Sequence, residues 1–166
     1  TIFGNDIRKL LLATNKDNEP SNLTELLLYS ADRAEHLSKK IIPALKRGDW
    51  ILSDRFSGST LAYQGHGRNI NINLIKKLDN IVCQNIKPDI TFLLEISAEE
   101  GIYRRKTKKP DRIESEGIKF LDKVNQGFKL IALENNREII QASNNEETIS
   151  KTIQDILIRK LSKKNV

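Results

Sequence analysis

Residues 90–96 read ITFLLEI, an almost uninterrupted apolar run. Such a run is typical of a parallel strand that is covered on both faces. Shorter runs at Trp50 to Ser53 and at Glu138 to Ala142 are also expected to be strands, and segments with a helical period separate all of them. Strands that alternate with helices predict an α/β fold in which helices flank a parallel sheet.

The expected helices have recognisable starts and ends. Ser21 is a candidate N-cap with Glu25 in the first turn, and its helix should run to about Ile42, where Pro43 is expected to kink it or to start a new turn. Since the sequence shows no linker, repeat or low-complexity block, we expect residues 1–166 to form a single domain. The other expected helices cover residues 1–13, 57–64, 73–84, 97–107, 117–135 and 145–163.

Composition limits the classes of function. The chain is 38% hydrophobic and 30% charged, with a net charge of +6, and no stretch approaches the ~20 apolar residues of a membrane span. Aromatic residues make up 5% of the chain, which is too few for the stacking surface of a single-strand-binding protein. One cysteine, Cys83, cannot form an internal disulfide. We therefore expect a cytoplasmic protein that binds small molecules and neither nucleic acid nor membrane.

Residues 54–68 read DRFSGSTLAYQGHGR and directly follow the expected strand at 50–53. An acid and an arginine at the carboxyl end of a strand lie where open α/β sheets bind ligands. Arg55 can form two parallel hydrogen bonds to a phosphate, and Asp54 can hold the water shell of a metal ion. Taken alone, the pair could equally form a strand-end salt bridge.

The spacing D-R-x-x-x-S-x-x-A-Y-Q-G-x-G-R resembles the nucleoside-monophosphate side of bacterial thymidylate kinases. The resemblance implies that Arg55 binds the acceptor monophosphate and that Asp54 helps to place Mg²⁺ through water. It also implies that Ser59, Tyr63 and Gln64 line the thymine and the sugar. Tyr63 would press against the C2′ edge, which favours a deoxy sugar.

Other basic and aromatic residues extend the resemblance. Tyr29 and Arg33 lie four residues apart on one helix face, as in the base-binding helix of the family. A core ring with a neighbouring ion pair is the alternative for these two. Arg8 is similar to a residue beside the acceptor phosphate. Arg68 is kept near the site by two glycines, although it could also be a surface arginine.

Residues 104–114 read RRKTKKPDRIE and resemble the start of the lid of these kinases, which we place at about 104–116. The resemblance implies that Arg104, Arg105 and Arg112 are catalytic groups, because arginines stabilise the charge that develops in phosphoryl transfer. A solvated charged loop is the alternative.

The resemblance implies that the intact protein uses ATP and Mg²⁺ to phosphorylate dTMP to dTDP. It also implies a homodimer and a P-loop NTPase fold of the nucleoside-monophosphate-kinase type. The P-loop pattern G-x-x-x-x-G-K-[ST] does not occur in these 166 residues, so we expect a family member that lacks its N-terminal strands. The alternatives are another deoxynucleoside or nucleoside monophosphate kinase and a basic binding module without catalysis.

Residues 1–166 expressed alone should show no kinase turnover, because nothing in them can replace the amides and the lysine of a P-loop. The measurement is ADP release with dTMP and Mg²⁺-ATP. A rate near the roughly 1–100 s⁻¹ of typical kinases would contradict this account.

Overall fold

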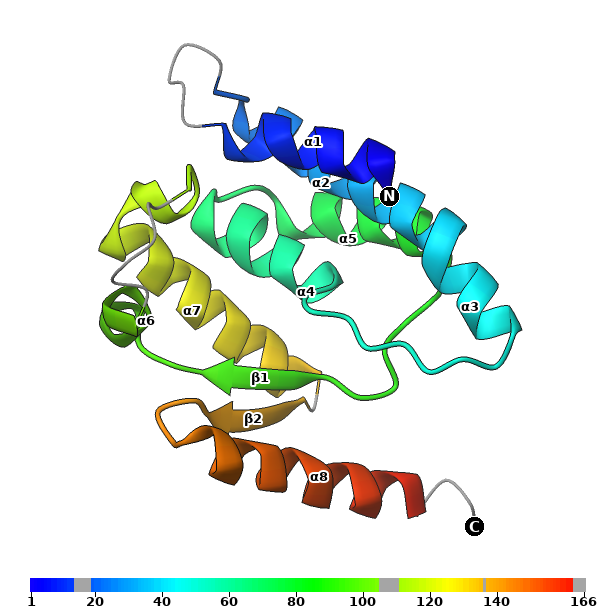
Figure 1. The fold of residues 1–166 in the computed structure, drawn as a ribbon. Helices are drawn as coiled ribbons and strands as arrows, with labels where there is room; N and C mark the ends of the chain where they lie inside the picture. The colour runs from blue at the N-terminus through cyan, green and yellow to red at the C-terminus, as the bar shows by residue number, and fades with distance from the viewer. Residues whose placement is uncertain (14–18, 105–110, 136, 163–166) are drawn as a thin grey trace.

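The computed structural model describes residues 1–13, 19–104, 111–135 and 137–162. Most of these residues are helical, and a small parallel sheet lies between the helices and the C-terminal helix (Figure 1). Three short helical segments deviate from α-geometry: two π-helical stretches, Leu37–Ile41 and Leu61–Gly67, and a 3₁₀ turn, Glu114–Glu116. The regular elements are α1 (Ile2–Leu12), α2 (Asn22–His36), α3 (Ile42–Lys46), α4 (Ser57–Thr60), α5 (Ile72–Cys83), β1 (Phe92–Glu95), α6 (Ala98–Arg104), α7 (Ile118–Glu134), β2 (Glu138–Gln141) and α8 (Glu146–Ser162).

The pairing of β1 with β2 confirms that the strands form a parallel sheet, as expected from the sequence. β1 pairs with β2 in parallel, with Leu93 opposite Ile139 and Leu94 opposite Ile140. The connection runs through α6 and α7, as a parallel crossover requires. Helix α8 lies against β2 on the far side of the sheet from α1 and α2 (Figure 1). The α/β class is therefore correct in its coarse form.

The strand expected from Trp50 to Ser53 does not form. This segment is irregular in the structure, with Trp50 81% exposed and Leu52 fully exposed. A strand is stable only when a neighbour satisfies its backbone N–H and C=O groups, and within the described ranges β1 and β2 pair only with each other. The apolar pattern indicates side chains that favour burial, but it does not show whether a neighbouring strand is present to pair with the segment.

The long second helix follows the prediction at its start, and at its end Pro43 lies in the first turn of a new helix, one of the two expected outcomes. The Ser21 hydroxyl accepts a hydrogen bond from Thr24 N, so Ser21 is the N-cap of α2. The helix passes through the π-helical stretch Leu37–Ile41 and continues as α3 to Lys46. Pro43 occupies the first turn of α3, where a missing N–H is tolerated.

The core lies where the π-helical stretch Leu61–Gly67 crosses α7. Ala62, Val124 and Ile131 are buried together there, and Gly67 and Gly127 allow the two helices a close approach. A second buried cluster joins the π-helical stretch Leu37–Ile41 to α5. In the described part of the chain, no helix is long and apolar enough to cross a membrane.

Gly127→Ala should destabilise the fold by about 1–3 kcal/mol, because overpacking forces neighbours to move. A Cβ at Gly127 would lie 2.7 Å from Cβ of His66. Urea unfolding measures the loss. Gly101→Ala in α6 is the control, since its Cβ would meet nothing closer than Ile96 Cγ2 at 4.0 Å. Equal losses of unfolding free energy in both variants would show that Gly127 has room for a Cβ.

Candidate functional site

A hollow lies between α1, α2, the 53–64 segment, α6 and residues from the 111–125 segment. It is a cleft of about 750 Å³. Its walls come from elements far apart in the sequence, so only the tertiary structure brings them together. Of the residues that the sequence predicts for a substrate site, the lining includes Arg8, Tyr29, Arg33, Asp54, Arg55, Ser59, Tyr63 and Gln64.

Arg55 has an unusual backbone conformation at the edge of the cleft. Its φ angle is +72°, in the left-handed region that non-glycine residues seldom adopt. The Ser53 hydroxyl donates to the Arg55 carbonyl at 2.8 Å, and the guanidinium carbon lies 5.2 Å from the centre of the Tyr63 ring. Desolvation lowers the pKa of Arg55, but the Tyr63 hydroxyl and Asp54 outweigh it and raise the pKa overall. Strain of this kind is characteristic of functional sites.

Arg33 on α2 lines the cleft and is also part of an ion pair with Asp79, which is the alternative that the sequence left open for it. Its guanidinium donates to Thr60 Oγ1 at 2.6 Å, to Asp79 Oδ1 at 3.3 Å and to the Phe56 carbonyl at 3.4 Å. Burial lowers the pKa of Arg33, although Asp79 opposes the shift. Thr60 and Asp79 were missed by sequence reasoning, because neither stands at a helical spacing from Arg33.

Two aromatic side chains border the same cleft. The Tyr63 ring packs edge-on against Phe128 with centroids 5.9 Å apart, and it lies 6.3 Å from Phe120. Helix α7 thus fixes its orientation. Tyr29 is half-buried one turn before Arg33, and burial, together with the Glu25 carboxylate, raises the pKa of its hydroxyl.

The remaining predicted site residues are not among the residues that line the cleft. Arg68 pairs with Glu25 and Glu116, and Arg104 donates to the Ala142 carbonyl and to Glu100. Arg112 is 7% exposed, and its guanidinium donates to the Leu11 carbonyl, Glu19 and Glu25. Arg105 lies outside the described residues. The catalytic roles expected for these arginines stay predictions.

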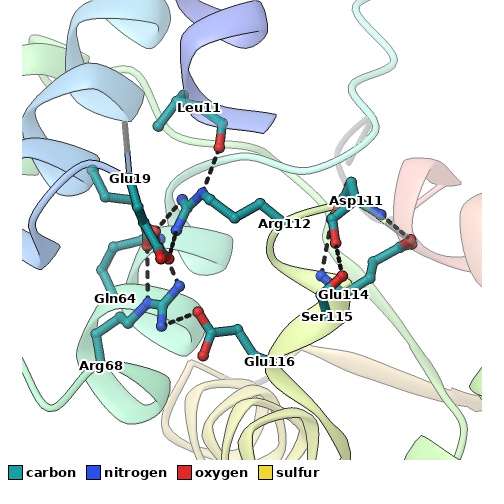
Figure 2. A network of polar contacts seen from close by, with 10 residues as sticks. Leu11, Glu19, Gln64, Arg68, Asp111, Arg112, Glu114, Ser115 and Glu116 are labelled. Atoms are coloured by element: carbon teal, nitrogen blue, oxygen red, sulfur yellow. Dashed lines mark hydrogen bonds and ion pairs between the residues drawn. The ribbon is translucent and has the colours of Figure 1, made fainter. Parts of the chain in front are cut away.

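Figure 2 shows the network that engages Arg112 and Arg68. The acceptor that these arginines share is the carboxylate of Glu25, which is 1% exposed. Glu25 accepts hydrogen bonds from Gln64 Nε2 at 2.8 Å, from Arg68 at 3.2 and 3.3 Å, and from Arg112. Sequence reasoning placed Glu25 only as a first-turn acid of α2. The available signal was its position beside Leu26 on the buried face of the helix.

Glu25 is ionised at neutral pH. Burial alone would raise its pKa, but the hydrogen bonds from Arg112, Gln64 and Arg68 outweigh burial and lower the pKa below its ordinary value. A buried carboxylate is stable only when it is paired in this way.

The comparisons with known proteins agree on one family. The family model for thymidylate kinase matches residues 1–153. The thymidylate kinase of Prochlorococcus marinus strain AS9601 is 60% identical over 162 residues, which cover 98% of this chain and 76% of the relative. That of strain NATL2A is 51% identical over 163 residues, which cover 98% of this chain and 77% of the relative.

An α/β fold with an arginine-rich cleft, matched over nearly its whole length to kinases, defines a phosphotransferase. The chain belongs to the thymidylate kinase family.

Stability should fall in acid because of Glu25. Its pKa is lowered in the folded state, so its stabilising effect is complete above the unfolded value of about 4.5 and is lost as the pH falls through the folded value. Glu25→Gln should lose roughly 3–5 kcal/mol at pH 7, since it leaves Arg112 and Arg68 without their buried partner. The Gln variant should also show a weaker decline in acid. Urea unfolding across pH 3–7 (about the range in which carboxylates titrate) measures both effects.

Glu116→Gln is the matched control. Glu116 pairs with Arg68 but is 25% exposed, so its loss should cost no more than about 1 kcal/mol. Parallel pH curves for wild type and Glu25→Gln would show that Glu25 does not titrate in this range.

Proposed function

We propose that the cleft is the acceptor site for dTMP, and that the enzyme transfers the γ-phosphoryl group of ATP to it to give dTDP. One observation carries the proposal: Arg55, in a strained backbone conformation, lies over the ring of Tyr63 at the edge of a cleft that also contains Tyr29 and Arg33. A phosphate-binding cation beside two aromatic rings matches a nucleoside monophosphate. These 166 residues contain no P-loop pattern, so the proposal concerns the acceptor half of the reaction.

Arg55 is the proposed phosphate-binding residue. The guanidinium fork binds a phosphate through two charge-assisted hydrogen bonds. Since the cation–π contact with Tyr63 and the bond from Ser53 hold the residue in place, little conformational freedom is lost when the acceptor binds. Arg8 lines the same cleft from α1 and is proposed to add positive charge near the phosphate.

The base is proposed to bind between Tyr29 and Arg33. The Tyr29 ring offers a stacking face, and Arg33 is held by Thr60, Asp79 and the Phe56 carbonyl in a fixed orientation. Fixed donors discriminate well, because a ligand that lacks the matching acceptor leaves a buried donor without its bond.

The sugar and the rest of the base are proposed to contact residues of the Ser57–Gly67 helical segment. Tyr63 is proposed to exclude a 2′-hydroxyl, and Ser59 and Gln64 line the same cleft. Arg68 supports this part of the cleft from behind through Glu25.

Mg²⁺ is proposed to bind with the nucleotides. Within the described residues there is no cluster of three or more histidine, cysteine or acidic side chains that could hold a metal ion by itself. The single carboxylate of Asp54 in the cleft fits Mg²⁺, which is bound through one or two carboxylates, substrate phosphates and water. When bound, the ion supplies positive charge that neutralises the phosphate oxygens.

Lid arginines complete the proposal. Arg104 and Arg112 donate to protein acceptors in this structure, so either would have to exchange those bonds to reach a phosphate. Another nucleoside monophosphate kinase remains the alternative enzyme, and the identity to thymidylate kinases favours dTMP. The binding-module alternative is disfavoured by the same matches.

A single domain and a homodimer are part of the proposal. Leu23 and Leu27 on α2 and Leu45 on α3 are exposed apolar residues along one continuous helical rod. A second copy of the chain would remove them from water.

Arg55→Ala should weaken dTMP binding by about 2–5 kcal/mol, because the phosphate loses a charge-assisted partner. Alanine is as strained as arginine in the left-handed conformation of residue 55, so a change in affinity reports the loss of the guanidinium group. Calorimetric titration of dTMP into both proteins provides the measurement. Arg47→Ala removes an arginine that pairs with Asp49 on the surface and is the control. Unchanged affinity in Arg55→Ala would mean that Arg55 is only structural.

Selectivity tests the function itself. The gene product that contains these residues should have a higher kcat/KM for dTMP than for the uridine ribonucleotide, because Tyr63 leaves no room for a buried 2′-hydroxyl. Steady-state kinetics with both acceptors provide the comparison. Equal kcat/KM values would exclude the role given to Tyr63.

A further inference from the structure

The buried carboxylate of Glu25 connects two parts of the chain that line the cleft. Gln64 lines the cleft from the Leu61–Gly67 stretch, and Asp111, Ile113 and Glu114 line it from another part of the chain. Arg112 stands between the lining residues Asp111 and Ile113 but is not itself in the lining. Its guanidinium donates to Leu11 and Glu19, as Figure 2 shows, and to Glu25. Glu25 therefore contacts both Gln64 and the segment of Arg112.

The bonds of Arg112 leave its segment little freedom. Its Nε donates to the Leu11 carbonyl at 2.8 Å and one terminal nitrogen donates to Glu19 at 3.1 Å, while the other reaches Glu25. These acceptors come from the end of α1, the following segment and α2. The segment is thus anchored to the helix that carries Tyr29 and Arg33.

The segment that contains Arg112 is a turn closed by hydrogen bonds between Asp111 and residues 114 and 115. Asp111 N donates to the Glu114 carboxylate at 3.0 Å, and Glu114 N donates to Asp111 Oδ1 at 2.9 Å. Ser115 Oγ adds a bond to the Asp111 carbonyl at 2.7 Å. Because the turn is braced internally, fixing Arg112 fixes the turn as a unit.

The chemistry of a carboxylate also orients Gln64. Ionised Glu25 can only accept hydrogen bonds, so the amide nitrogen of Gln64 must face it. The reverse orientation would place the amide oxygen against a carboxylate oxygen. The orientation of a cleft side chain therefore depends on the charge of a residue that is not itself among those lining the cleft.

We infer that Glu25 is a positioning residue for the acceptor site: its carboxylate holds Gln64 and, through Arg112, the 111–116 turn. The inference rests on the proposed binding of dTMP in this cleft. Arg112 serves here as an anchor of the turn. The spacing of these two parts of the lining is set by one buried ion-pair network.

The test separates positioning from folding. In the gene product that contains these residues, Glu25→Gln should raise KM for dTMP by about tenfold to a hundredfold, since small displacements of positioned groups cost that much. KM for ATP should not change. A merely structural role would reduce the active fraction and lower kcat, with both KM values unaltered, and that result would overturn the inference.

Two further variants sharpen the result. Asp49→Asn is the control, because Asp49 is 47% exposed, pairs with Arg47 and does not line the cleft, so KM for dTMP should stay at the wild-type value. If Glu25→Gln does not fold, the double variant Glu25→Gln with Arg112→Met removes the buried cation that would otherwise lack its partner. The raised KM should persist in it, and a wild-type KM there would overturn the inference.

Calorimetric titration of wild type with dTMP distinguishes the two proposals. A wild-type protein that does not bind dTMP would overturn the proposed function and, with it, the inference. Normal binding by wild type, together with an unchanged KM in a folded Glu25→Gln variant, would overturn the inference alone.

Discussion

The Glu25 carboxylate is buried beside two arginines, and much of the cleft depends on how its charge is satisfied. Taking a carboxylate out of water costs several kcal/mol, which is recovered only if its partners are well placed. Arg112, Arg68 and Gln64 supply these partners from three different parts of the chain. The network therefore forms completely only when α2, the Leu61–Gly67 stretch and the 111–116 turn are all in position.

A second constraint orients the cleft from the opposite side. Helix α7 crosses the Leu61–Gly67 stretch at Gly127, and its Phe120 and Phe128 rings fix Tyr63. The Phe120 ring also lies 4.7 Å below the guanidinium of Arg68. Apolar packing and the ion-pair network thus meet at Arg68, so the aromatic wall and the polar support of the cleft are linked.

Functional residues and structural residues are close neighbours here. Arg55 and Arg33 border the cleft, whereas Arg68 and Arg112 act behind it, although all four are arginines in motifs of similar appearance. Arg112 is 7% exposed and contacts two carboxylates, while Arg55 stands in an open, strained loop. Arg33 lines the cleft although it also pairs with Asp79, so pairing with an acid does not by itself distinguish the two groups.

The sequence by itself determined the helices, the β1 and β2 strands and the family, because these depend on local periodicity, caps and motif spacing. It also named eight of the residues that line the cleft. Only the tertiary structure decided that Trp50–Ser53 is not a strand and that Glu25 is the buried centre of a network. Strand pairing and charge burial depend on partners distant in the sequence, and a local pattern cannot specify which partner will be present.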